Sequence, residues 1–430
     1  MDGFRRWLDS RLQPSFIAPA ASAITALALI MAVVLFATST QGKTALGIPL
    51  GADFAGFYVA AQILEQGQTP QLYDRDLHQR MYHELLPHEH ANVAIPYVHP
   101  PFVAGLLRPL TRLPYPTAVG IWMTITTALY LCGTQLLMRS IPGSGPLPTW
   151  LATLVAFSFE PFLFECCLGG QLSAVAFFSY AVSFALLQYR QPLWAGCALG
   201  ICFYKPTLLL LMVPMLLIGR QWRMLIGMTI TGILLVGLSL LLVGWDVNIS
   251  YLDVLVSFRK STAGGDLEIR TWKYVDLNNC LRLLLGNSSA WQLPLLAVIG
   301  AGPFCWLAWR WWNVDRLNVQ DRRWLWAATL AWAPVLNLYV GVYDSILIVQ
   351  SALITSIVLL AVVSVPHPLL RSKYGYLFAA IYVATWFSQN LAARTGIPLY
   401  TAFMMLLGTW QLLEIGRHAS SIESLSSSSN

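Results

Sequence analysis

The sequence has few charged residues for its length. Only 11% of its 430 residues are Asp, Glu, Lys or Arg, against about 25% in an average soluble domain. Hydrophobic residues make up 57% of the chain, and they occur in long runs rather than in strict alternation. A backbone in lipid must form its hydrogen bonds within helices or a closed barrel, and long runs favour helices. The composition therefore predicts an all-α polytopic membrane protein and excludes an ordinary soluble enzyme.

Several signatures of known chemistry are also missing. The chain has no Walker loop, no Gly-rich dinucleotide fingerprint after a strand and no nucleophile elbow, so we do not expect it to consume nucleotides. Its seven cysteines show no paired metal spacing and are interpreted as small packing residues. The net charge of +6 is modest and spread over loops, which does not indicate a nucleic-acid partner. The apolar run at 16–38 is long enough to span and lacks a clear cleavage site, so we expect it to stay as an anchor.

The basic residues predict how the chain crosses the membrane. Arg5, Arg6 and Arg11 place the N-terminus in the cytoplasm by the positive-inside rule. Counting onward gives about twelve spans with both termini inside, including a short one from 100 to 108 and one over 193–218 that Lys205-Pro206 interrupts. Residues 1–417 form a single membrane domain, and the Ser-rich tail 418–430 is expected to be disordered. Two long loops, 39–99 and 245–290, are expected outside, and both are expected to carry amphipathic helices.

The first outer loop contains the stretch Gly51–Gly67, around which we expect the chain to be organised. Its apolar residues Phe54, Phe57 and Leu64 recur at helical spacing, which predicts a helix along the membrane surface with Asp53 at its start. A second amphipathic helix is expected from Asp74 to about residue 86. Asp53 has two interpretations at this point: a helix N-cap, or a functional carboxylate at the boundary of water and lipid.

The second outer loop is rich in cations with interleaved aromatic residues. Its cations are Arg259, Lys260, Arg270, Lys273 and Arg282, and Trp272 and Tyr274 lie among them. Positive charge outside the membrane departs from the usual bias and suits an anionic ligand, although a surface that faces lipid headgroups has the same composition. Transfer of a group from a lipid phosphate requires at least a carboxylate that acts as a base and, opposite it, a cluster that binds the phosphate.

Several short motifs, in their order along the chain, resemble the integral-membrane glycosyltransferases of family 87 in the GT-C superfamily. They are Gly51-Ala-Asp-Phe54, Gly67, Leu72-Tyr-Asp74, Pro100-Pro101, Leu107-Arg-Pro-Leu110, Gly170-Gln171, Lys205-Pro206, Ala333-Pro334 and Tyr343-Asp344. The resemblance implies a mannosyltransferase-like enzyme that uses a polyprenyl-phosphate sugar at the outer face of the bacterial inner membrane. It makes Asp53 the catalytic base of a single inverting displacement. His99 stands before Pro100-Pro101, where an aromatic residue is more usual.

This resemblance assigns further roles. Cations that would stabilise the departing phosphate are His99, Lys205, Arg270 and Lys273, and residues that would line the substrate are Phe57, Tyr58, Gln171, Trp272, Tyr274, Tyr343 and Asp344. The aromatic residues are also explained by an interfacial belt, and Glu160, Glu165 and Asp344 by helix packing. His88-Glu-His90 could hold a divalent metal, but its spacing matches no closed site, so no metal or other cofactor is expected.

The expected partners are a polyprenyl-phosphate-linked sugar donor, a lipid or glycan acceptor and membrane lipids. Three alternatives share parts of this pattern. A transporter or flippase of lipid-linked substrates would predict an inverted repeat, and only Lys205-Pro206 suggests a broken helix. A non-catalytic scaffold does not explain the polar groups embedded beside the outer loops. A ligase or polymerase of lipid-linked glycans has the same topology and stays open.

Overall fold

The structure is a computed structural model that describes residues 11–39, 44, 49–86, 97–141, 149–264, 271–286, 290–362 and 373–416. Within these ranges most residues lie in helices joined by turns and short loops, and the extended structure is limited to isolated bridges such as that between Tyr274 and Gly341. The elements, in chain order, are α2 (Pro14–Ala37), α3 (Ala52–Glu65), η1 (Thr69–Gln71), α4 (Arg75–Leu85), α5 (Pro101–Leu107), η2 (Arg108–Arg112), α6 (Tyr115–Ser140), α7 (Thr149–Phe157), η3 (Pro161–Leu168), α8 (Ser173–Gln188), α9 (Pro192–Gly200), η4 (Ile201–Tyr204), η5 (Pro206–Leu209), α10 (Met212–Ile218), α11 (Trp222–Gly264), η6 (Thr271–Lys273), α12 (Leu277–Leu285), α13 (Gln292–Trp312), η7 (Val314–Arg316), α14 (Val319–Trp332), η8 (Val342–Ile346), α15 (Leu347–Val362), α17 (Lys373–Thr395) and α18 (Leu399–Glu414).

Five helical segments are long and apolar enough to cross a membrane. They are Pro14–Ala37, Tyr115–Ser140, Trp222–Ser257, Gln292–Trp312 and Val342–Leu360, and the pair α7 and η3 makes a sixth if its 61° bend lies within one span. Shorter apolar helices, among them α8, complete the bundle. The described helices therefore confirm a helical membrane protein, while the count of twelve spans stays a prediction.

The segment expected to span from 100 to 108 does not do so. It forms α5, whose seven residues rise only about 10 Å, a third of the hydrocarbon thickness. The two arginines that were expected on the inner side, Arg108 and Arg112, both form ion pairs with Glu65 at the end of α3. Residues 101–112 therefore lie on the same side of the molecule as the first outer loop.

The run 193–218 is two helices rather than one kinked span. Gly196 of α9 lies against Met224 of α11, and Gly200 lies against Met228 and Thr231, so α9 and α11 run parallel. Two parallel helices need a connection that brings the chain back to the end of the bundle where the first helix began. Here η5 and α10 form this connection. The reversal is at Lys205-Pro206, because proline cannot continue the hydrogen bonding of η4.

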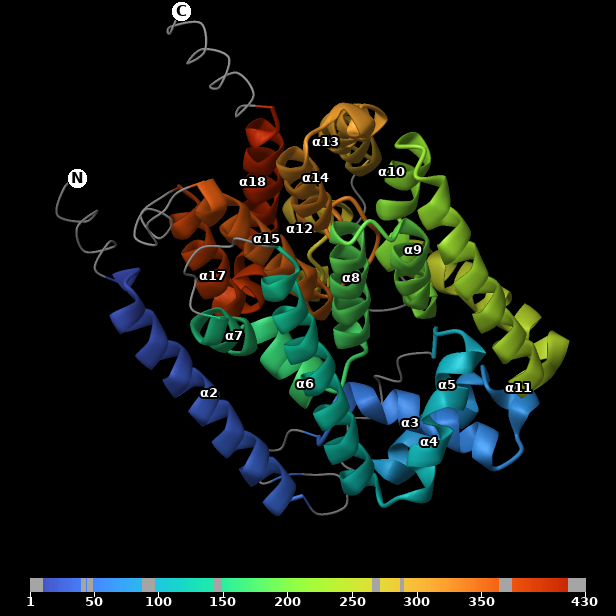
Figure 1. The fold of residues 1–430 in the computed structure, drawn as a ribbon. Coiled ribbons are helices and arrows are strands. Elements are labelled where there is room, and N and C mark those ends of the chain that lie inside the picture. The colour runs from blue at the N-terminus through green and yellow to red at the C-terminus, as the bar shows by residue number, and fades with distance from the viewer. Residues whose placement is uncertain are drawn as a thin grey trace, which may run out of the picture.

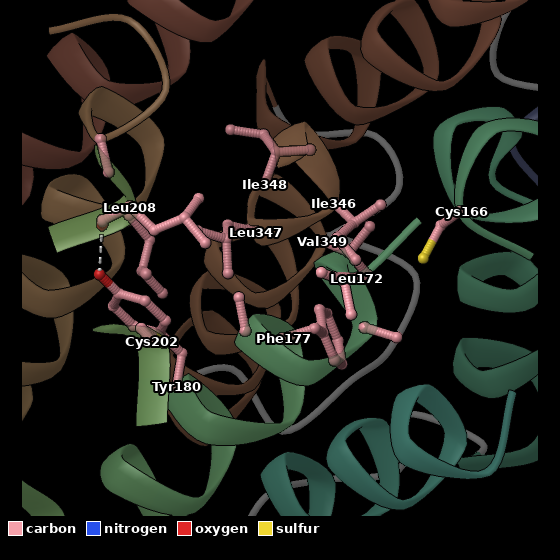
Figure 2. Packing of buried hydrophobic residues seen from close by; sticks show 14 of the residues in the cluster. Cys166, Leu172, Phe177, Tyr180, Cys202, Leu208, Ile346, Leu347, Ile348 and Val349 are labelled. Atoms are coloured by element: carbon pink, nitrogen blue, oxygen red, sulfur yellow. Dashed lines mark hydrogen bonds between the residues drawn. The ribbon is translucent and has the colours of Figure 1, made fainter. Parts of the chain in front are cut away.

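The helices form a bundle whose edges are α2 on one side and α11 on the other, with α8 between them (Figure 1). The best-buried region surrounds α8, where short irregular segments meet. Figure 2 shows Leu208 of η5 near Tyr180 and residues of η8 and the start of α15 near Phe177, and the Tyr180 hydroxyl donates to the carbonyl oxygen of Leu208 at 2.8 Å. These breaks in the helices place polar residues at one end of the bundle, beside α3.

The first outer loop forms the two expected helices. Asp74 caps α4 by accepting the backbone N–H groups of Asp76 and Leu77. The other helix, α3, differs from expectation in its surroundings: residues on most of its faces are buried, because α4, α5 and η2 pack around it. Protein rather than a membrane surface therefore covers most of α3.

Candidate active site

Asp53 lies in the first turn of α3, at the polar end of the bundle. The helix begins after Gly51, which has a left-handed conformation with φ of 59°, and no side chain caps this end within the described residues. Instead, the backbone N–H groups of Asp53 and Phe54 donate to the carbonyl oxygen of Gly169, at 3.0 and 3.2 Å. The Asp53 carboxylate is therefore not used as a cap, and its negative charge lies at the positive end of the helix dipole.

A glycine pair holds α3 in place. Gly170 has φ of +84°, and a Cβ atom on it would lie 2.5 Å from the Cβ of Phe54. The Gly170 carbonyl oxygen accepts the indole N–H of Trp122 at 2.9 Å. Only glycine allows this close approach in this backbone conformation. The turn places Gln171, the next residue, beside Asp53.

The surroundings of Asp53 alter its pKa. Burial raises the pKa of its carboxyl group above the ordinary value of 3.8, and the negative charge of Glu165 acts in the same direction. A hydrogen bond from the Gln171 side chain and the positive charges of Lys273 and Lys205 lower this pKa. The net shift is upward, which makes the carboxylate a stronger base than an exposed aspartate.

Lys205 is held by a buried polar network. Its Nζ forms an ion pair with Asp344, whose side chain is only 1% exposed, and it lies 4.7 Å from the centre of the Tyr343 ring. The second carboxylate oxygen of Asp344 accepts the hydroxyl of Ser173 at 2.7 Å. The network joins the chain reversal after η4 to α8 and η8, so it fixes three segments around the site.

Lys273 has a different environment. It lies in η6, half-buried, with its Nζ 5.8 Å from the centre of the Trp272 ring. Its charge acts on Asp53, yet among the described residues no carboxylate lies within ion-pair distance of it. Of the two lysines near Asp53, Lys273 is thus the better placed to meet an incoming anion.

His99 packs between aromatic rings near the same end of the bundle. Its ring lies 5.0 Å from that of Phe57, edge to face, and its Nδ1 is 3.2 Å from the carbonyl oxygen of Tyr204. Burial lowers the pKa of His99 to about 4, and the charge of Lys205 contributes. At neutral pH the ring is therefore uncharged, and it can offer a ligand a hydrogen bond rather than a positive charge.

The remaining predicted residues lie near the site, away from it or outside the described residues. Tyr274 forms the bridge with Gly341 and lies in the segment that also carries Lys273. Tyr58 points away: its hydroxyl donates to the carbonyl oxygen of Leu113 at 2.9 Å, so it holds α3 to the turn before α6. Arg270 and the His88-Glu-His90 sequence lie outside the described residues. Within the described part of the chain, no group of three or more His, Cys, Asp or Glu is arranged to hold a metal.

Two further polar residues border this region. Gln389 of α17 donates to Glu165 at 3.2 Å, and Ser173 contacts Asp344 as described above. Neither Gln389 nor Ser173 had a signal in the sequence, because neither belongs to a recognisable motif and polar residues at other positions of α17 and α8 look the same. Their partners are far away in the chain, and only the fold brings them together.

The fold and the site define a polytopic membrane protein with a carboxylate and cations gathered at one end of the bundle. Comparison with known families gives the class: the family model of glycosyltransferase family 87 matches residues 97–339. The chain therefore belongs to glycosyltransferase family 87 and is a glycosyltransferase. No curated protein and no solved structure matches it significantly. The matched range includes His99, Gln171, Lys205 and Lys273, while Asp53 and Asp344 lie outside it.

Proposed function

We propose that this chain is an inverting glycosyltransferase that moves a sugar, with mannose as the first candidate, from a polyprenyl-phosphate donor to a hydroxyl group of a lipid or glycan acceptor. We further propose that it works at the outer face of a bacterial inner membrane, with both termini in the cytoplasm. The observation that carries this proposal is the position of Asp53, which is half-buried, raised in pKa, not used as a cap and close to two lysines.

The proposed reaction is a single displacement. Asp53 accepts the proton of the acceptor hydroxyl while that oxygen forms a bond to the anomeric carbon of the donor sugar. The bond between the anomeric carbon and the phosphate oxygen breaks, and its electron pair leaves with the lipid phosphate. Negative charge then grows on the phosphate, where Lys273 would stabilise it. Attack from the side opposite the phosphate inverts the anomeric carbon.

The other described residues have supporting roles in this proposal. Gln171 holds the Asp53 carboxylate by its hydrogen bond, and Asp344 holds Lys205 close to it. Trp272, Phe57 and Tyr343 supply flat apolar surfaces near the site, against which a sugar ring or the first isoprene units can pack. His99 offers a neutral hydrogen-bonding ring.

The first test is sugar transfer by purified protein in lipid vesicles, with a panel of polyprenyl-phosphate sugars and a mixed lipid acceptor. Asp53→Asn should lower transfer about 10²–10⁴-fold, because it removes the base and keeps the size of the side chain. The matched control is Asp74→Asn in the same loop, where asparagine can cap α4 as aspartate does. It should keep full activity.

The result decides between the open alternatives. Equal transfer by the native protein and a correctly folded Asp53→Asn variant would contradict the role of Asp53. A native product that carries several added sugars, or a whole transferred glycan, would favour a polymerase or ligase. The product also identifies the donor sugar and the acceptor.

A further inference from the structure

The long helix α11 is sharply folded at Gly244. This residue has φ of 79° and ψ of −177°, which is outside the helical region. The hydroxyl of Ser239 bonds to Oδ1 of Asn248 at 2.7 Å across this point. In a straight helix, nine residues would separate them by roughly 14 Å along the axis. The chain therefore leaves the direction of the spanning part, Trp222–Val243, at Gly244.

The part beyond the fold has three distinct faces. Trp245, Ile249, Leu252 and Val256 follow one another at intervals of four, three and four residues, so they lie within about 60° of each other around the axis. Asp246 and Asp253 share a second face, seven residues apart. The third face packs on the protein: Val247 is 5% exposed, and Tyr251 lies 6.0 Å from the ring of Tyr73.

The apolar face is uncovered in the structure. Trp245 is 67% exposed, Ile249 42%, Leu252 53% and Val256 54%. A continuous stripe of this kind is unfavourable in water. The part of α11 before Gly244, Trp222–Val243, has 22 residues and rises about 33 Å, which is enough to cross the hydrocarbon core. The stripe follows this part directly, so we place its start at the level of the lipid headgroups. Tryptophan at that level is typical of a membrane interface.

We propose that residues 245–257 form a membrane-surface helix, with its apolar stripe in the lipid and its two aspartates in water. The occupant of the stripe is the bilayer itself, because the stripe is continuous with the lipid-exposed surface of the preceding span. The apolar helix at the membrane surface that the sequence suggested for residues 51–67 is thus placed instead after Gly244.

This helix is connected to the candidate active site in two ways. Tyr251 stacks near Tyr73, whose hydroxyl donates to the carbonyl oxygen of His99 at 2.7 Å. The chain after α11 leads directly to η6, which carries Lys273. A helix held in the headgroup layer sets the depth of both segments. We infer that it aligns the site with the phosphate of a lipid-linked donor, a consequence that rests on the proposed function.

Spin labels test where the helix 245–257 lies, and this measurement does not depend on sugar transfer. In a background whose free cysteines are replaced, labels at Ile249→Cys and Leu252→Cys should collide more often with oxygen, which enriches in lipid, than with a water-soluble nickel chelate. Labels at Asp246→Cys and Asp253→Cys should show the reverse. High nickel collision at 249 and 252 would overturn the proposal. So would low collision with both agents together with cross-linking between copies through Ile249→Cys, since a second copy would then cover the stripe.

Activity tests the connection to the site. The double variant Ile249→Gln with Leu252→Gln should raise the KM for a long-chain donor severalfold and leave kcat within about twofold. A short-chain, water-soluble donor analogue should show no change in KM, and Asp253→Gln on the water face is the matched control. An unchanged KM for the long-chain donor, or an equal rise in KM for both donors, would contradict the alignment. If the native protein transferred no sugar, the proposed function would fail while the spin labels still decided where the helix lies.

Discussion

At the scale of single residues, the burial of Asp53 lowers the stability of the fold and suits the role of base that we propose for it. A carboxyl group whose pKa is raised by burial binds its proton more tightly in the folded protein than in the unfolded chain, so ionisation of Asp53 costs folding free energy at neutral pH. The same shift strengthens it as a base. Such a residue is common at functional sites and has little use in packing alone.

The pH dependence of transfer follows from this shift. The base must be ionised, so kcat/KM should fall as the pH decreases through the pKa of Asp53, at a pH above the 3.8 of an ordinary aspartate. Gln171→Leu removes a hydrogen bond that lowers this pKa, so it should move the acid limb to higher pH. A pH profile of kcat/KM measures both. An unmoved limb in the Gln171→Leu variant would show that Gln171 does not act on the base.

Lys205 and Asp344 should depend on each other for stability. Removing one member of a buried pair leaves the other charge uncompensated and costs about 3–5 kcal/mol. Lys205→Met should therefore lower Tm strongly, since the Asp344 side chain is only 1% exposed. The double variant Lys205→Met with Asp344→Asn should recover much of the loss. Additive losses in the thermal unfolding of the four proteins would contradict the pairing.

At the scale of the elements, the contact between α3 and the turn after η3 positions Asp53. Gly170→Ala should lower both Tm and transfer. The new Cβ would meet Phe54 at 2.5 Å, and the left-handed backbone adds about 1–2 kcal/mol of strain. Gly67→Ala is the matched control, because Gly67 also has a positive φ of 75° but nothing lies within 4 Å of its added Cβ. Equal effects of the two substitutions would show that backbone strain alone is responsible.

The sequence predicts helices better than it predicts their surroundings. Apolar spacing and Asp74 located α3 and α4 correctly, because both signals are local. The predicted span over 100–108 is wrong, because a short apolar run followed by arginines also fits a helix that packs against α3. The two arginines form ion pairs with Glu65 instead, which lies more than 40 residues away in the chain. The chain reversal at Lys205-Pro206 also depends on helix neighbours that periodicity does not show.

At the scale of the whole molecule, the low charge and long apolar runs were sufficient to predict a helical membrane protein. The candidate site was predictable only in part. Asp53, Gln171 and Lys205 come from short motifs and do lie together, whereas Ser173 and Gln389 carry no local mark. In the described part of the chain, Lys205 pairs with a carboxylate and Lys273 does not. This difference depends on how the helices pack, which the sequence does not show directly.

The order in which the site is synthesised has a consequence for how the protein matures in its membrane. Asp53 is made early and inserted with the first helices, but Lys273 follows much later and Asp344, the partner of Lys205, later still. A nascent chain that ends before residue 271 therefore presents this carboxylate without Lys273, and its Lys205 lacks Asp344. Under the proposed function, sugar transfer would begin only after η8 has joined the bundle, so an incomplete chain stalled during insertion would not consume lipid-linked donor.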